Sequence, residues 1–189
     1  TQFCLYLSGY IVTKSSAYIR DAACHVEYTN IAALFAYKVN TGTTYSGKTV
    51  KLGQTIDLDS VEWVPIGGDT TANGSKGKIF KGTFDGQGYG IRNLSVTADR
   101  FYVGFFGSVQ GTVRNFGIYS GRVIGDKKVA GLAGYFSGTM ENCFNRAAVT
   151  GGSHTGGLIG SPDALTMTNC FNTGTVKAEL VGGGLMGWM

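Results

Sequence analysis

From about residue 90 onward the sequence repeats itself in four segments: "GIRNLSVTADRFYVGFFG", "GTVRNFGIYSGRVIGDKKVAGLAG", "GTMENCFNRAAVTGGSHTGGLIG" and "LTMTNCFNTGTVKAELVGGGLMG". Each contains an asparagine, then short apolar bursts, then a closing G-x-x-G box. Both markers recur at a nearly constant interval, apart from a shorter step between the first two asparagines. Because the asparagine and the glycine box both recur in all four segments, the sequence contains a genuine internal repeat. The repeated positions are Asn93, Asn115, Asn142, Asn169, Gly104, Gly131, Gly157 and Gly184.

The repeat predicts a solenoid with rungs of about 27 residues, because a unit of about 20 to 50 residues must stack on its neighbours to bury its apolar face. The apolar bursts, such as Val113, Phe116 and Ile118, are short, and no segment sustains a helical period. The rungs are therefore strands joined by turns. We expect an all-β fold, a parallel, right-handed β-helix.

Equivalent residues of successive rungs should stack at the strand spacing of about 4.8 Å. The expected interior columns are Ile91, Val113, Met140 and Met167, and Leu94, Phe116, Cys143 and Cys170. We expect each repeated asparagine at a bend, where its amide bonds the backbone or the same asparagine one rung away. Cys143 and Cys170 should be neighbours with free, buried thiols, because parallel Cβ vectors make poor disulfide dihedrals.

The chain before the repeats divides into two further parts. Residues 1–28 form a leader without a known motif, whose alternating apolar residues would suit strands. Residues 29–89 begin with a helix at about 31–39, which should cap the N-terminal opening of the solenoid, and continue into the first rungs; residues 90–189 hold the repeats. The leader carries Cys4 and Cys24, and the sequence leaves open whether they form a disulfide.

The stretch "GTTYSGKT" at residues 42–49 fits the phosphate-binding pattern G-x-x-x-x-G-K-[ST]. A working phosphate loop leaves a buried strand and enters a helix whose N-terminal amides face the phosphates. Here the predicted helix comes first, and "TVKLGQTIDL" after it alternates at the period of a strand. The order is reversed, so we expect a flexible turn and no bound nucleotide.

The four boxes "GFFG", "GLAG", "GLIG" and "GLMG", with "WVPIG" and "FKGTFDGQGYGIRNLSV" before them, resemble the GLUG-motif repeat proteins over about residues 29–189. Such repeats are known from large bacterial surface and secreted proteins, including adhesin-like chains and the region outside the catalytic part of some immunoglobulin A peptidases. The resemblance implies a β-helical solenoid outside the cell. In the family's "W.PIG" motif, Trp63 should serve packing.

Composition narrows the possible partners. The net charge of +4 is spread thinly and predicts no nucleic-acid interface. No apolar run approaches the roughly 18 residues of a membrane helix, and no signal-peptide pattern occurs at Thr1. His25 and His154 belong to no metal-spaced cluster, so neither metal nor cofactor is expected, and His154 should lie in a solvated loop. At "GGGLMGWM" a further rung or a partner should cover the end of the solenoid. The partner can be a second copy of the chain, in end-to-end self-association.

Two functions compete. A non-catalytic, adhesin-like module would present a surface to host or matrix glycans or proteins, with Tyr102, Tyr119 and Tyr135 as candidate exposed rings for binding sugars. The alternative is a fragment of a carbohydrate-active, pectin-lyase-like β-helix enzyme, which "FDGQG" at residues 84–88 resembles. Glycosidases need two carboxyl groups about 5 to 10 Å apart. Asp85 has no evident partner in the sequence, so we expect no catalytic residues.

Overall fold

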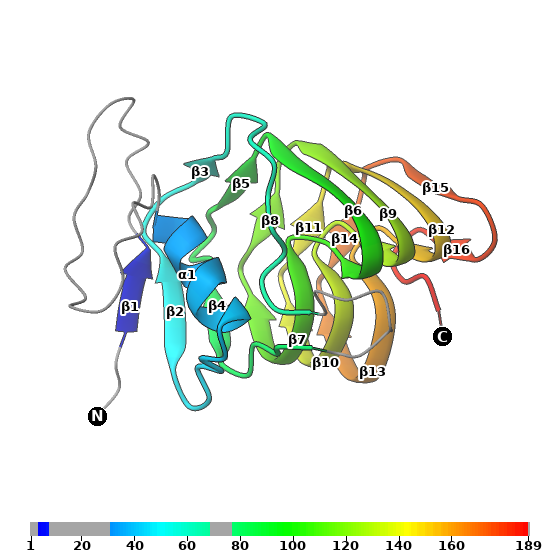
Figure 1. Cartoon of the computed structure of the whole chain (residues 1–189). Helices are drawn as coiled ribbons and strands as arrows, with labels where there is room; N and C mark the ends of the chain where they lie inside the picture. The colour runs from blue at the N-terminus through cyan, green and yellow to red at the C-terminus, as the bar shows by residue number, and fades with distance from the viewer. Residues whose placement is uncertain (1–3, 8–30, 69–76, 189) are drawn as a thin grey trace.

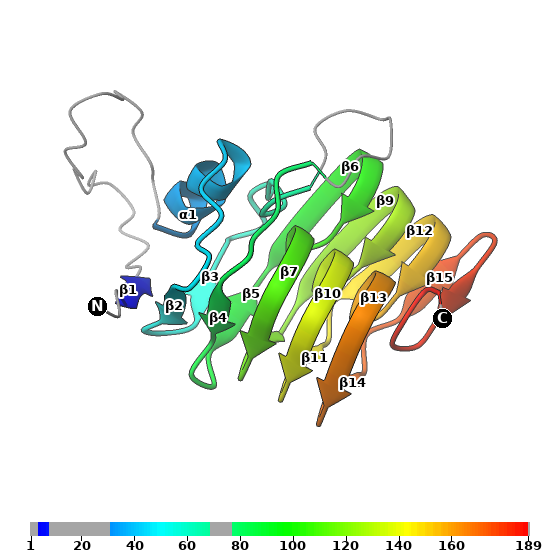
Figure 2. The same cartoon turned by 90° about the horizontal axis from the view of Figure 1, so that it is seen from below.

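The computed structural model describes residues 4–7, 31–68 and 77–188. The described chain forms a parallel β-solenoid of about four turns, with one short helix near its N-terminal end (Figure 1). Turned by 90°, the successive rungs lie side by side along one axis (Figure 2). The predicted fold class, all-β and solenoidal, is confirmed.

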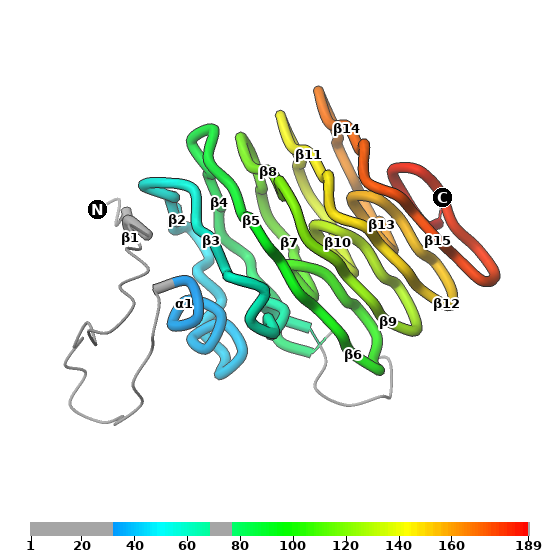
Figure 3. Tube along the Cα trace, turned by 90° about the horizontal axis from the view of Figure 1, so that it is seen from above, coloured from blue at the N-terminus to red at the C-terminus, as the bar shows by residue number. Residues whose placement is uncertain are grey.

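Three parallel sheets form the sides of the solenoid. Sheet A consists of β1 (Cys4–Leu7), β2 (Thr49–Leu52), β4 (Thr83–Asp85), β7 (Phe106–Arg114), β10 (Ala133–Glu141) and β13 (Ile159–Thr168). Sheet B consists of β3 (Ile56–Asp57), β5 (Gly90–Arg92), β8 (Gly117–Ile118), β11 (Phe144–Asn145) and β14 (Phe171–Asn172). Sheet C consists of β6 (Leu94–Val103), β9 (Gly121–Ala130), β12 (Ala148–Gly156) and β15 (Val176–Ala178), and β16 (Gly182–Gly183) pairs with β12. The short strands of sheet B lie in a row in Figure 3.

Strand alternation separates an apolar interior from a polar exterior. In sheet A one in-register interior column is Val50, Phe84, Val113 and Met140, all fully buried. One residue before each lies a threonine of an outward column. This column is Thr49, Thr83, Thr112, Thr139 and Thr166. Inward and outward residues thus alternate along each strand, and each rung contributes one residue to each column. The same pattern therefore recurs in the sequence once per rung.

The first repeat is out of phase with the sequence alignment. Ile91 pairs with Ile118 rather than Val113, and Leu94 pairs with Gly121 rather than Phe116. Asn93 lies at the corner between sheets B and C, whereas the later repeated asparagines follow sheet A. The shorter step from Asn93 to Asn115 arose because two different corners both carry asparagine. The expected columns are therefore wrong at Ile91 and Leu94.

The G-x-x-G boxes let the backbone of one rung approach the next. A Cβ on Gly134, the second glycine of its box, would lie 2.2 Å from the carbonyl carbon of Tyr102. Three residues near the ends of the strands of sheet C have positive φ, and each meets the second glycine of a later box: Tyr102, Lys128 and His154. In the second and third boxes the first glycine, Gly131 or Gly157, serves a different contact, since a Cβ there would lie 2.4 or 2.3 Å from Cγ of Asn145 or Asn172. Only glycine fits both places.

Helix α1 (Ile31–Asn40) covers the N-terminal part of the core. Its buried face is Ala32, Phe35, Ala36 and Val39, at the i, i+3, i+4, i+7 spacing of one helical stripe. The ring of Phe35 contacts those of Phe80 and Phe84 at centroid distances of 5.5 and 5.9 Å. Leu34 is only half-buried.

The end of α1 is fixed to the "WVPIG" segment. The side chain of Asn40 accepts a hydrogen bond from the Gly67 amide (2.7 Å) and donates one to the Pro65 carbonyl (3.1 Å). Trp63 stacks on Phe105 at 5.0 Å and donates its indole N–H to the Phe105 carbonyl. The expected packing role of Trp63 is confirmed.

The stretch from Gly42 to Thr49 joins α1 to β2, so the predicted order of helix, loop and strand is confirmed. The Lys48 amide bonds the Tyr45 carbonyl in a turn, and β2 begins at Thr49. The absence of nucleotide binding stays a prediction.

At the C-terminal end of the described solenoid, the side chains of Leu180 and Trp188 are exposed. That a further rung or a partner covers this end stays a prediction. His154 does not lie in a loop: it belongs to β12, is half-buried and stands 4.8 Å from the Trp188 ring. Cys24 lies outside the described residues. No described helix is long and apolar enough to cross a membrane.

Candidate functional site

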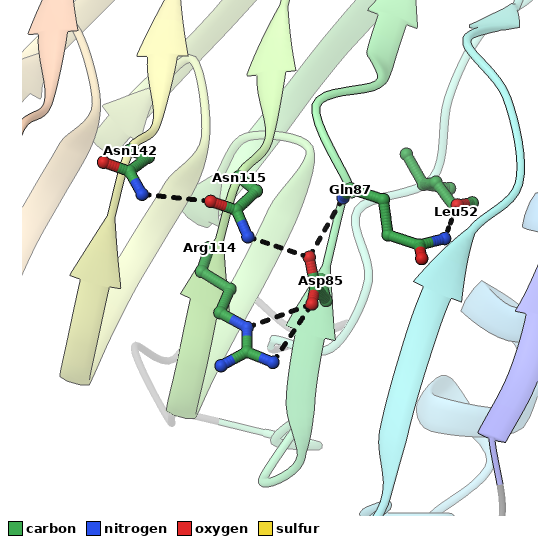
Figure 4. A network of polar contacts seen from close by, with 6 residues as sticks. All are labelled: Leu52, Asp85, Gln87, Arg114, Asn115 and Asn142. Carbon is green, nitrogen blue, oxygen red and sulfur yellow. Dashed lines mark hydrogen bonds and ion pairs between the residues drawn. The ribbon is translucent and has the colours of Figure 1, made fainter.

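A polar network begins where β4 leaves sheet A (Figure 4). Asp85 Oδ1 accepts hydrogen bonds from the Gln87 amide (3.0 Å) and from Asn115 Nδ2 (3.1 Å). Asp85 Oδ2 accepts from Arg114 Nε at 3.1 Å, and Arg114 Nη2 lies at 3.1 Å from the same oxygen. The Gln87 side chain reaches back to the Leu52 carbonyl of the preceding rung. The "FDGQG" segment is thus a turn pinned by its own aspartate.

The asparagines continue this network along the solenoid axis. Asn142 Nδ2 donates to Asn115 Oδ1 (3.0 Å), and Asn169 Nδ2 donates to Asn142 Oδ1 (3.2 Å). All three residues have φ between 51° and 53°, the left-handed conformation that asparagine tolerates best after glycine. Asp85 is the acceptor at the first end of this ladder.

Asn93 stands apart from the ladder. Its side chain donates to Asp57 Oδ1 (2.8 Å) and accepts from the Ser120 hydroxyl (3.2 Å). Both are contacts between adjacent rungs at the corner of sheets B and C.

A second, interior ladder was missed by the sequence reading. Asn145, fully buried, donates to Asn172 Oδ1 (2.9 Å) and closes a local turn through the amide and carbonyl of Ala147. Asn172 makes the same two turn contacts with Gly174. The signal was present in the sequence, because "NCFN" occurs in both of the last two repeats, although its second asparagine has no counterpart in the first two.

The two cysteines of "NCFN" lie in register on adjacent rungs between these ladders. Both thiols are free, as expected, with Cys143 buried and Cys170 only partly buried. A hydrogen bond between them raises the pKa of Cys143 and lowers that of Cys170. They lie in the same interior column as Phe116.

The environment of Asp85 keeps it ionised. Burial raises the pKa of this carboxyl, but hydrogen bonds from Gln87 and Asn115 and the Arg114 guanidinium together outweigh burial and hold the pKa below its ordinary value. A carboxylate with a lowered pKa is a poor proton donor and a weak base at neutral pH. Its saturated bonding indicates a structural role.

Replacing Asp85 by Asn should lower the free energy of unfolding by about 1–3 kcal/mol at pH 7, because an amide nitrogen would face the Arg114 guanidinium. A depressed folded-state pKa contributes stability above the unfolded value of about 3.9 and loses it as pH falls through the folded value. The deficit of the variant should therefore shrink below about pH 4. Urea unfolding at pH 7 and at pH 3 measures both.

Asp126→Asn is the matched control, since Asp126 is exposed and lies 3.8 Å from an equally exposed Lys127. Its effect should stay within about 0.5 kcal/mol. An Asp85→Asn deficit that is equal at the two pH values would contradict the ionised, stabilising carboxylate.

Two of the three tyrosines proposed for sugar binding are buried. Tyr102 is 3% exposed, and its hydroxyl accepts from Lys128 Nζ (3.2 Å). Tyr135 is 5% exposed, and its hydroxyl donates to Asp163 (2.8 Å). Their rings contact each other at 5.8 Å. The expectation of exposed rings is wrong for both, because these side chains fold over the neighbouring rung.

Tyr119 alone belongs to an accessible aromatic surface, on the outside of sheet B. It is half-buried and meets Phe144 edge to face at 5.0 Å, and Phe144 stacks on Phe171 at 5.4 Å with an interplanar angle of 10°. A shallow groove of about 490 Å³ lies beside the Phe144 ring. Its lining is Asp85, Gln87, Gly88, Asn115, Phe116, Asn142 and Phe144.

No family model, curated protein or solved structure matches this chain. Among the described residues, no three His, Cys, Asp or Glu side chains gather in a way that could hold a metal ion.

Proposed function

We propose that this chain is a non-catalytic, extracellular module of a bacterial adhesin-like surface protein of the GLUG-motif type, which presents or spaces a binding surface. The observation that carries the proposal is the bonding of Asp85, the one carboxylate that is buried among the described side chains. Four donor atoms engage it, so its charge is committed to joining two rungs. The glycine boxes and the accessible rings of sheet B support a display role.

The carbohydrate-active alternative has one observation in its favour. Asp85, Arg114 and Glu141 lie in register in one outward column of sheet A, which places two carboxylates two strand spacings apart, about 10 Å, on either side of a guanidinium. Glycosidase carboxyl groups stand about 5 to 10 Å apart. The separation lies at the upper limit, and Asp85 lacks the raised pKa of a general acid.

One experiment separates the two functions. A glycan array should show binding, while release of reducing or unsaturated sugar ends from the bound glycans should stay at the background of a buffer blank. Turnover that disappears in both Asp85→Ala and Glu141→Gln, with melting temperatures unchanged in the second variant, would make the enzyme the better assignment.

A further inference from the structure

The outer face of sheet B carries two parallel columns of side chains. In one column Arg92, Tyr119 and Arg146 occupy successive rungs, since the Tyr119 amide bonds the Ile91 carbonyl and the Arg146 amide bonds the Ile118 carbonyl. The residues between them along each strand point inward: Ile91, Ile118 and Asn145 are fully buried. Arg92 and Arg146 are exposed. Two residues before, the second column holds Gly117, Phe144 and Phe171.

The arginines lie against the rings of this face. The guanidinium carbon of Arg146 is 5.2 Å from the centre of the Phe144 ring, and that of Arg92 is 5.8 Å from the centre of the Tyr119 ring. Such contacts hold a cation at an apolar surface and restrict its side chain. Phe171, in strand β14 of sheet B, is 46% exposed.

Neither guanidinium forms an ion pair or a hydrogen bond with any described residue. Arg114, at the adjacent corner, differs in that Asp85 neutralises it. One carboxylate, Asp57, stands next to Arg92 in the same column, but it forms no ion pair with Arg92, and its Oδ1 accepts from Asn93 Nδ2 and from the Asp59 amide. The face therefore offers two fixed positive charges without a strong internal partner.

The spacing of these charges points to an extended ligand. Arg92 and Arg146 are two strands apart, which is about 10 Å. Apolar rings lie between and beside them, and the amides of Asn142 and Asn169 are exposed along the neighbouring corner. Guanidinium groups bind carboxylates, rings pack against the C–H faces of sugars, and amides bond hydroxyls. Two cations are too few for the dense phosphate contacts of nucleic acid.

We propose that the outer face of sheet B binds an acidic polysaccharide, whose carboxylates contact Arg92 and Arg146 while its sugar rings pack on Tyr119, Phe144 and Phe171. This inference rests on the proposed function, since it assigns a ligand class to the display surface. The proposed binding site therefore excludes the buried Tyr102 and Tyr135. It lies on the outer face of sheet B, where Tyr119 is the central residue.

The test uses an unbranched polyuronate, the same polymer methyl-esterified, and polyglutamate, each titrated into the full chain by calorimetry at low salt. The polyuronate should bind at least about tenfold more tightly than either comparison polymer, since the ester lacks the charge and polyglutamate lacks the sugar rings. Removing both arginines (Arg92→Ala with Arg146→Ala) should weaken polyuronate binding by about 100-fold, and Phe171→Ala by about tenfold.

Arg122→Ala is the matched control, because Arg122 is an exposed arginine of sheet C. It should leave the affinity unchanged. Equal losses in Arg122→Ala and the double variant, or equal affinity for polyglutamate, would overturn the proposal. Binding of only neutral glycans on the array would also overturn it while leaving the display function intact, whereas cleavage of the polyuronate would overturn the display function instead.

Discussion

Replacing Phe35 by Asp is expected to lower the free energy of unfolding by about 4 kcal/mol or more. Phe35 is 2% exposed, and its ring joins α1 to Tyr45, Phe80 and Phe84. The substitution removes a large buried ring and places a carboxylate without a partner among aromatic side chains. Because α1 covers this part of the core, the variant should also self-associate through the uncovered apolar surface. Denaturant unfolding and light scattering measure the two effects.

Leu34→Asp supplies the comparison on the same helix. The side chain is half-buried and lies outside the stripe formed by Ala32, Phe35, Ala36 and Val39, so the cost should be about 1 kcal/mol. Both side chains lie in the helix that the sequence predicts at about residues 31–39, so the pattern alone does not separate their roles. Equal losses in the two variants, or a monomeric Phe35→Asp with unchanged melting, would refute the cap as described.

Replacing Gly134 by Ala should cost at least about 3 kcal/mol, although it adds a single methyl group. The new Cβ would lie 2.2 to 2.5 Å from backbone atoms of Tyr102 and Val103 in the preceding rung. Backbone atoms within a hydrogen-bonded ladder cannot rotate away as a side chain can. Relief requires separation of β10 from the preceding corner, which would weaken the stacking of two rungs. Thermal and urea unfolding measure the loss.

Gly184→Ala is the control within the same motif. Gly184 is the first glycine of the last box, and a Cβ there would meet no described atom within 4 Å. Its effect should be within about 0.5 kcal/mol. A Gly134→Ala protein as stable as Gly184→Ala would show that the box does not govern rung packing.

The sequence was sufficient to predict the architecture. A solenoid places one residue of each rung in each column, so the spatial repeat is written directly as a regular period in the sequence. The same logic located the ladder of Asn115, Asn142 and Asn169. The helix and the strand after "GTTYSGKT" were also predictable, because helical and strand periods differ within a few residues.

The phase of the first rung was decided by tertiary structure. Asn93 and Asn115 look equivalent in a linear alignment, yet they occupy different corners, because Gly90 pairs with Gly117 rather than with the residue that the alignment places opposite it. The pairing of strands sets this register. The turn at Gln87 lengthens the first rung, and a fixed sequence period does not account for the added residues. The sequence pattern alone does not show which of the two corners an asparagine occupies.

Side-chain accessibility was likewise settled only by the fold. Tyr102 and Tyr119 are alike in the sequence, but Tyr102 folds over a neighbouring rung while Tyr119 stands on the outer face of sheet B with Phe144. Local periodicity records whether a residue in a strand points inward or outward. It does not record what covers a corner residue, because that cover comes from adjacent rungs that are distant in the sequence, and their approach depends on glycines such as Gly134.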